Sequence, residues 1–162
     1  MQISLIIHSA TGKTHHCAEI IGEGIKSVNN TDFKIMSVED VDKEYVAQSD
    51  CVLIGTPTYY ANMAWQVKKW FDEGGVDLSG KLGGVFATAN VIGGGSETAL
   101  LTMVNHMLVK GMLVYSAGCS KGKPYTHLGV TSLNEVPEEN QREKIFLFGQ
   151  RMAEKAWELF GK

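Results

Sequence analysis

Short apolar runs alternate along this chain with longer stretches in which apolar residues recur every three or four positions. The short runs are too brief for helices, whereas the longer stretches have the spacing of one buried helical face. The resulting order, βαβαβαβαβα, indicates an α/β protein whose parallel sheet is covered by helices on both faces. We expect a single domain over residues 1–162, because this length is typical of one domain.

The expected strands are the most continuous apolar runs, at Ile3–Ile7, Phe33–Val38, Cys51–Gly55, Leu82–Ala87 and Met112–Ala117. Helical spacing predicts helices over Cys17–Val28, Met63–Phe71, Ala99–Leu108 and Glu138–Phe160, with a short helix or loop at Asp40–Gln48. Cys119–Pro137 has no periodicity and predicts a long connection, which is usually functional or mobile. Right-handed crossovers between five such strands are compatible with a doubly wound sheet of order 2-1-3-4-5.

Composition excludes several classes of function. The net charge is -3 and no basic stripe is present, so nucleic-acid binding is not expected. No apolar run is long enough to cross a membrane, and the first residues lack the charged segment of a signal peptide. The three cysteines form no CxxC pair and are expected to be buried or half-buried free thiols, as in a reducing compartment. We therefore expect a cytoplasmic protein.

Three unusual loops follow the first, third and fourth expected strands. They are Ser9–Thr14, Thr56–Asn62 and Thr88–Glu97. In doubly wound sheets, ligands bind beyond the carboxyl ends of the strands, where the strand order reverses. Because these three strands are neighbours in the expected order, their loops should converge on one ligand site.

The first of these loops joins a strand directly to a helix. It carries the hydroxyls of Ser9, Thr11 and Thr14, together with backbone N–H groups around Gly12 and Lys13. A helix N-terminus favours an anion, and hydroxyls add hydrogen-bond donors without adding charge. We interpret the loop as a phosphate-binding loop, in preference to a simple helix cap with spare hydroxyls.

Other nucleotide and metal motifs are missing. A Walker loop needs a glycine where Ile7 stands, and no GxGxxG follows the first strand. The adjacent His15 and His16 point in different directions, and we find neither a metal site nor a Ser–His–Asp arrangement. The run Gly93–Gly95 after the fourth strand would let backbone N–H groups approach a flat ligand.

Together the loops resemble the flavodoxin superfamily, most closely the WrbA-type NAD(P)H:quinone oxidoreductases and the related NADPH-dependent FMN reductase-like proteins. The resemblance rests on Ser9-x-Thr-Gly-x-Thr14, Gly55-Thr-Pro-Thr58 with Asn62-Met63, Gly93-Gly-Gly-x-Glu97, His106…Gly111-Met112 and Gly122-x-Pro124-Tyr125. It implies a flavodoxin-like three-layer sandwich that binds FMN non-covalently. The implied cofactor-binding residues are Ser9, Thr11, Gly12, Lys13, Thr14, Pro57, Thr58, Tyr59, Tyr60, Asn62, Thr88, Ala89, Asn90, Gly93, Gly94 and Gly95.

The resemblance also implies electron transfer from NAD(P)H through FMN to a quinone-like or other small acceptor. The flavin would carry the chemistry, so no catalytic residue is assigned, and Tyr125 and His127 are candidates for the substrate side. The alternative is a flavodoxin-type electron carrier, which the mild net charge and the lack of an aromatic residue in the third loop disfavour. A regulatory protein that only senses flavin is a third possibility.

Self-association is expected from the second helix. Trp70 can enter the core with Val67 and Phe71, which leaves Trp65 facing outward beside the second loop. A large exposed aromatic side chain at the rim of a site often marks an interface. With the implied likeness to WrbA-type proteins, this predicts a homodimer or homotetramer.

Overall fold

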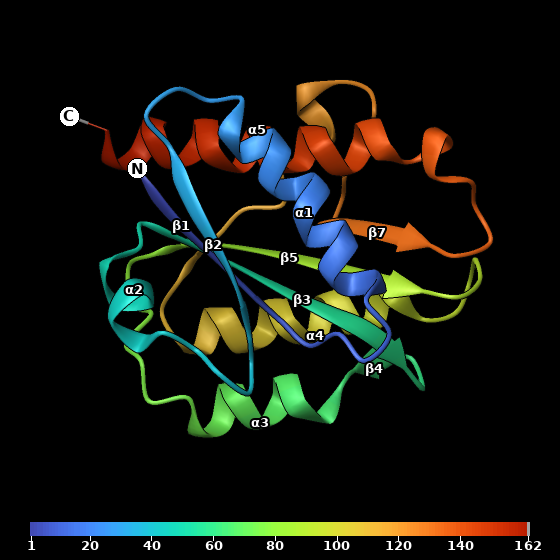
Figure 1. The fold of residues 1–162 in the computed structure, drawn as a ribbon, viewed down its shortest axis with the longest axis horizontal. Helices are drawn as coiled ribbons and strands as arrows, with labels where there is room; N and C mark the ends of the chain where they lie inside the picture. The colour runs from blue at the N-terminus through green and yellow to red at the C-terminus, as the bar shows by residue number, and fades with distance from the viewer. Residues whose placement is uncertain (162) are drawn as a thin grey trace.

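A computed structural model describes residues 1–161 as a parallel sheet between two layers of helices (Figure 1). Helices α1 and α5 cover one face, and α3 and α4 cover the other. The strands are β1 (Gln2–Ile7), β2 (Asp32–Ser37), β3 (Cys51–Tyr59), β4 (Asn62–Met63), β5 (Leu82–Ala89), β6 (Leu113–Val114) and β7 (Val130–Leu133). The helices are α1 (Lys13–Lys26), α2 (Lys43–Gln48), α3 (Trp65–Glu73), α4 (Ser96–Val109) and α5 (Arg142–Phe160), with short 3₁₀ turns at Cys119–Lys121 and Glu138–Asn140.

The sheet differs from the prediction in its number of strands and in its edge. Its main path is β2-β1-β3-β5-β6, while β4 pairs with β3 and β7 pairs with β5. The predicted five-stranded sheet of order 2-1-3-4-5 is therefore wrong in these respects, since seven strands take part. The pairings along the main path are parallel, as the alternation of strands and helices predicts.

The edge position next to β5 is shared by two short strands. Leu82 and Gly83 of β5 pair with β6, whereas Phe86–Ala89 pair with β7. Of the expected strand Met112–Ala117, only Leu113–Val114 pairs as β6. Ala117 and Gly118 both have positive φ angles, 62° and 56°, which an extended strand does not permit. The chain then leaves the sheet and returns at Val130.

A tight hairpin joins β3 to β4. Tyr60 and Ala61 at its tip both have positive φ angles, 49° and 59°. Two such residues in succession form the mirror-image turn that matches the twist of a two-stranded ribbon. Met63 pairs with Thr58 in this hairpin, so the helix expected from Met63 begins at Trp65 instead.

Two apolar cores lie on opposite faces of the sheet, because successive side chains of a strand point to opposite faces. Leu5 of β1 packs toward α1 and α5, whereas its neighbour Ile6 packs toward α3 and α4. Trp70 is 8 % exposed beside the buried Val67 and Phe71, while Trp65 is 67 % exposed, as the helical spacing predicts.

Helices α1 and α5 approach each other closely through glycines. A Cβ atom on Gly149 of α5 would lie 2.0 Å from the carbonyl oxygen of Ile21, and one on Gly24 of α1 would lie 2.0 Å from that of Phe146. No real side chain tolerates such distances from backbone atoms. Glycine at these two positions therefore sets the spacing between the two helices. The same spacing fixes the position of the loop that precedes α1.

Candidate cofactor site

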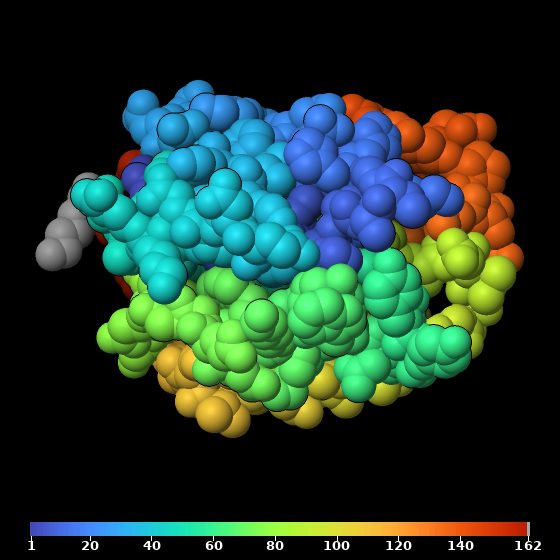
Figure 2. Space-filling view, turned by 60° about the horizontal axis from the view of Figure 1, so that its bottom comes forward, coloured from blue at the N-terminus to red at the C-terminus, as the bar shows by residue number. Residues whose placement is uncertain are grey.

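The three unusual loops meet at the carboxyl ends of β1, β3 and β5. They enclose a hollow of about 260 Å³, which we call the loop hollow. Figure 2 shows the first loop (blue), the hairpin (green) and the third loop (yellow-green) at the same end of the molecule. The lining residues are Ala10, Thr11, Lys13, Thr14, Pro57, Thr58, Tyr59, Thr88, Ala89, Asn90 and Asn134.

The first loop presents a helix N-terminus with free N–H groups to this hollow. Gly12 precedes α1 with φ 85°, a left-handed conformation that glycine adopts without strain, and it supplies no side-chain cap. Ser9 Oγ accepts a hydrogen bond from the N–H of His15 at 3.1 Å. The N–H groups of Lys13 and Thr14, in the first turn, cannot find partners within the helix. The loop therefore combines free backbone donors with the exposed side chains of Thr11 and Lys13.

Hydroxyl groups link the loops across the floor of the hollow. Thr14 Oγ1 and Thr88 Oγ1 lie 3.0 Å apart and share a hydrogen bond between the first and third loops. The hydroxyl oxygen of Thr58 is buried and has no hydrogen-bond partner among the described residues. A buried hydroxyl without a partner is costly, so its place on the wall of the hollow suits a ligand that bonds to it.

The third loop is braced by the segment that follows β7. Asn134 Nδ2 donates to Asn90 Oδ1, and the N–H of Ile92 donates to the carboxylate of Glu135. On its other side, Gly95 precedes α4 with φ 89°, and a Cβ atom there would lie 2.3 Å from Cβ of Ala61. Glycine at this position therefore lets the hairpin tip touch the third loop.

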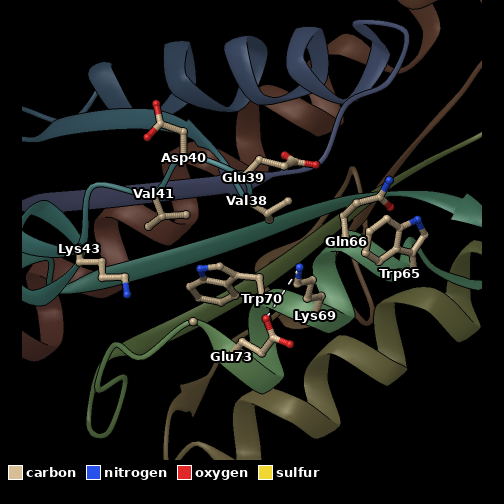
Figure 3. Close-up of a pocket in the computed structure, with 11 residues that line it drawn as sticks. Val38, Glu39, Asp40, Val41, Lys43, Trp65, Gln66, Lys69, Trp70 and Glu73 are labelled. Atoms are coloured by element: carbon tan, nitrogen blue, oxygen red, sulfur yellow. Dashed lines mark ion pairs between the residues drawn. The ribbon is translucent and has the colours of Figure 1, made fainter.

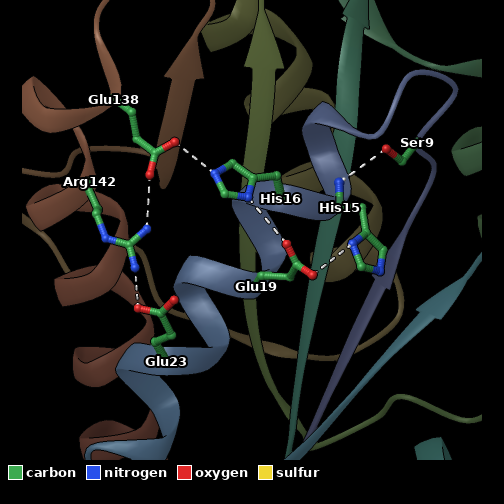
Figure 4. A network of polar contacts seen from close by, with 7 residues as sticks. All are labelled: Ser9, His15, His16, Glu19, Glu23, Glu138 and Arg142. Atoms are coloured by element: carbon green, nitrogen blue, oxygen red, sulfur yellow. Dashed lines mark hydrogen bonds and ion pairs between the residues drawn. The ribbon is translucent and has the colours of Figure 1, made fainter.

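A polar network anchors the segment after β7 to α1 (Figure 4). His16 Nε2 lies 2.8 Å from Glu138 Oε2, and Arg142 contacts both Glu138 and Glu23. The hydrogen bond that Glu138 accepts from His16 raises the pKa of His16 above its ordinary value of 6.5, against a smaller opposing effect of burial, and Glu19 raises this pKa further. Glu138 follows Glu135 by three positions in the chain, and Glu135 is the residue that supports the third loop. The network therefore also fixes the segment that carries Glu135.

The hydrogen bond between His16 and Glu138 predicts a raised pKa of His16 that can be measured directly. The pKa of His16 is raised in the folded chain, so its contribution to stability is complete below about pH 6.5 and is lost as the pH rises through the folded-state pKa. In an NMR titration of the ring protons, Glu138→Gln should lower the pKa of His16. Glu19→Gln should lower it less, and an unchanged pKa in Glu138→Gln would contradict the assignment.

Most predicted residues line the loop hollow, but not all of them. Ser9, Gly12, Tyr60, Asn62, Gly93, Gly94 and Gly95 shape the surrounding loops without lining it. Tyr125 and His127 also lie outside it, in a connection that Arg151 ties to α5 through the carbonyl oxygen of Pro124 at 3.1 Å. Sequence reasoning missed Ala10 and Asn134. Asn134 directly follows β7, so recognising that short strand would have placed it at this edge of the sheet.

A larger cleft of about 620 Å³ lies elsewhere, between α3 and the segment after β2 (Figure 3). Trp65, Trp70 and Lys69 line one side, and Val38 and Glu39 line the other. None of the predicted cofactor-binding residues lines it. Glu39 connects it to the first loop through His8, whose Nδ1 lies 2.9 Å from Glu39 Oε1.

The remaining polar and sulfur groups offer little further chemistry. Within residues 1–161, no three His, Cys, Asp or Glu side chains gather in a way that could hold a metal ion. Burial raises the pKa of the Cys17 thiol to about 12, and Cys119 is the exposed cysteine.

No helix in the described part of the chain is long and apolar enough to cross a membrane.

Known proteins share this arrangement. The family model described as a flavodoxin domain matches residues 4–107, which include all three loops. A flavodoxin from Clostridium saccharobutylicum is 50% identical over 99% of this chain and 100% of its own. The chain belongs to the flavodoxin family. In structure, a flavodoxin from the domain Archaea superposes with a TM-score of 0.79 and 25% identity, over 96% of this chain and 99% of that one.

Membership in the flavodoxin family corrects the predicted activity. The prediction of an NAD(P)H:quinone oxidoreductase is wrong, because the 50% identical relative is a flavodoxin. An NAD(P)H dehydrogenase (quinone) from Trichlorobacter lovleyi is only 26% identical, over 83% of this chain and 78% of its own. A WrbA-like flavodoxin structure from Agrobacterium tumefaciens has a TM-score of 0.79 at 22% identity, over 97% of this chain and 98% of that one, and shows the shared fold.

Proposed function

We propose that this flavodoxin-family chain is an electron carrier that holds FMN in the loop hollow and passes electrons between partner proteins. Bound FMN would supply the chemistry, because it accepts and releases electrons. The free N–H groups at the N-terminus of α1, with Thr11, Lys13 and Thr14, would bind the phosphate. The walls formed by Pro57–Tyr59 and Thr88–Asn90 would enclose the ring system.

The 50% identical relative, a flavodoxin, carries this proposal, and the shape of the hollow supports it. At about 260 Å³ it is smaller than the roughly 300–1,000 Å³ of typical small-molecule pockets. Because the hollow is small and open, part of a flavin ring bound there would stay exposed. Tyr59 and Tyr60 stand exposed beside it, at 43 % and 105 % of their reference areas. An exposed ring edge suits electron transfer to a protein that docks there.

The charges around the hollow support docking by a basic partner. Lys13 is the lysine of the three loops, and its positive charge faces a phosphate site. The other charged side chains of the loops and turns at this end are mainly carboxylates, namely Glu39, Asp40, Glu97, Glu135, Glu138 and Glu139. The net charge of -3 conceals this asymmetry, because it averages the acidic end with lysines elsewhere.

Anaerobic spectroscopy of the FMN-loaded chain tests the proposal. NADH and NADPH should bleach the bound FMN no faster than they bleach free FMN, since the proposed carrier takes its electrons from a protein. A reduced basic electron-transfer protein should bleach it quickly, at a rate that falls as ionic strength rises. Rapid bleaching by NADPH with many turnovers of benzoquinone would contradict the carrier function.

Matched charge variants separate local from overall charge. Glu139→Lys, in the exposed 3₁₀ turn between β7 and α5, should slow bleaching by the basic donor protein, whereas Glu154→Lys within α5 should not. Both substitutions change the net charge equally. Equal slowing by the two variants would therefore contradict docking at the acidic end.

A further inference from the structure

We propose that the cleft beside α3 is a ligand site, separate from the loop hollow, for a small aromatic carboxylate. This cleft of about 620 Å³, which we call the α3 cleft, lies between α3 and the segment after β2 (Figure 3). Its volume falls within the roughly 300–1,000 Å³ of typical small-molecule pockets. The α3 cleft and the loop hollow share no lining residue, so the inference does not depend on FMN binding.

One face of α3 forms the long wall of the α3 cleft. The residues that line the cleft from this side recur every three or four positions, which places them on the same side of the helix. They are Gln66, Lys69, Trp70 and Glu73. Val38 and Val41 line the opposite side with apolar surface. A wall of valine opposite the Trp70 indole suits a flat aromatic ring, which packs favourably against both.

Hydrogen-bond donors gather at the end of the cleft where α3 stops. Figure 3 shows the ammonium groups of Lys43 and Lys69 on either side of the Trp70 ring. A Cβ atom on Gly74 would lie 3.1 Å from the Trp70 indole nitrogen, so glycine leaves the space beside this N–H open. A Cβ atom on Gly75 would lie 3.5 Å from Lys43 Nζ, and no carboxylate of the described residues pairs with this ammonium group. Two ammonium groups and an indole N–H around one opening are donors suited to a carboxylate.

The carboxylates around the α3 cleft leave these donors available. Glu39 is held by His8, whose Nδ1 lies 2.9 Å from Glu39 Oε1. Asp40 points away from the cleft in Figure 3. Glu73 reaches Lys69 only at 3.9 Å, and its side chain is 68 % exposed, so it is free to turn into water. An anionic ligand would therefore meet an excess of positive charge at this end of the cleft.

A hydrogen-bond acceptor without a partner lies toward the other end of the cleft. The amide oxygen of Gln66 is buried and has no hydrogen-bond partner among the described residues. A buried acceptor without a partner is costly, so a ligand hydroxyl that donates to this oxygen would be favoured. Gln66 and Gly74 are eight residues apart, a rise of about 12 Å along α3. The ligand would thus carry a carboxylate at one end and a hydroxyl at the other, as 6-hydroxy-2-naphthoate does.

The indole N–H signals of the tryptophans test the proposal on the full chain. In proton–nitrogen correlation spectra of an isotope-labelled sample, the Trp70 signal should move as 6-hydroxy-2-naphthoate is added. The shift should saturate with a dissociation constant of about 1 mM or lower, as expected for a ligand of this size. The Trp157 signal should stay in place, because its N–H donates to Thr31 Oγ1 at 2.8 Å on the other side of the sheet. Saturating FMN should leave the affinity unchanged.

Matched ligands separate the contributions of charge and hydroxyl. The neutral 6-hydroxy-2-naphthamide should bind about 10-fold more weakly or worse, because it loses the attraction to the two lysines. The 2-naphthoate ion, which lacks the hydroxyl, should bind about threefold more weakly or worse. In Gln66→Leu the two naphthoates should bind alike, because the hydroxyl has lost its acceptor.

Charge variants locate the carboxylate. Lys43→Gln and Lys69→Gln should each weaken the binding of 6-hydroxy-2-naphthoate about 3- to 10-fold. Lys123→Gln, at an exposed lysine between β6 and β7, changes the net charge equally and should not weaken it. Glu73→Gln should strengthen binding, because it removes the competing carboxylate beside Lys69.

Four results would overturn the proposal. The first is a Trp70 signal that does not move up to about 10 mM ligand. The second is equal binding of the naphthoate and the naphthamide, since the cleft would then not select an anion. The third is a loss of affinity in Lys123→Gln as large as in Lys43→Gln, which would show attraction by overall charge only. The fourth is competition by FMN, since the cleft would then not be separate from the flavin site.

Discussion

Replacing Thr11 by valine should weaken FMN binding about 10- to 100-fold while leaving riboflavin binding nearly unchanged. The difference between the two ligands is the phosphate, and one hydrogen bond to a charged group contributes about 1.5–3 kcal/mol. Thr11 is exposed at the mouth of the loop hollow, so the isosteric valine should leave the fold intact. Flavin fluorescence titration of the apoprotein with both ligands measures the effect.

Two further variants define what the Thr11 result means. Ser120→Ala removes an exposed hydroxyl in the β6–β7 connection and should bind both ligands like the wild type. Thr14→Val should weaken FMN binding and also lower stability by about 1 kcal/mol, because Thr14 is buried and bonded to Thr88. If Thr11→Val weakens riboflavin as much as FMN, the first loop does not bind the phosphate.

Replacing Gly149 by alanine should lower the free energy of unfolding by about 2–4 kcal/mol. Two effects oppose each other at this position. Alanine is the better helix former by about 1 kcal/mol, but its Cβ would lie 2.0 Å from the carbonyl oxygen of Ile21. Backbone atoms of a packed helix cannot move aside as a flexible side chain can, so the steric effect prevails. Urea unfolding of the apoprotein should show a lower midpoint with an unchanged m-value.

Gly22→Ala is the matched control for this prediction. Gly22 is also buried inside a helix, but a Cβ atom there would meet the far end of the half-buried Phe33 ring, which can turn away. Its loss of stability should be clearly smaller than that of Gly149→Ala. Equal losses would mean that glycine at the α1–α5 crossing has no special role.

Long apolar segments were predictable from the sequence, and short edge elements were not. Hydrophobic periodicity alone is enough to recognise the longer elements, namely β1, β3, β5, α1 and α4. β7 has four residues and is held by pairing with β5, which is a tertiary contact that no local pattern reveals. The β3–β4 hairpin was missed because Tyr60 and Ala61 occupy positions where glycine or asparagine usually signals the turn.

The site was predictable in its location but less so in its boundaries and function. The rule that ligands gather beyond the carboxyl ends of parallel strands brought the three loops together, and the hydroxyls of the first loop indicated a phosphate. Asn134 was not foreseen, since it reaches the hollow only because β7 ends there. The sequence disfavoured the flavodoxin-type alternative because of its mild net charge, but net charge says nothing about where the carboxylates lie.

The N-terminus and the last turn of α5 lie at the side of the molecule opposite the three loops (Figure 1). The amino group of Met1 bonds to the carbonyl oxygen of Asn30 at 2.9 Å, and α5 ends at Phe160 on that same side. A peptide linker, a fused module or an immobilising tag attached at either end would therefore extend away from the loop hollow. This geometry makes the protein suitable for covalent tethering, to a second redox domain or to an electrode, with the proposed FMN-binding end still facing outward.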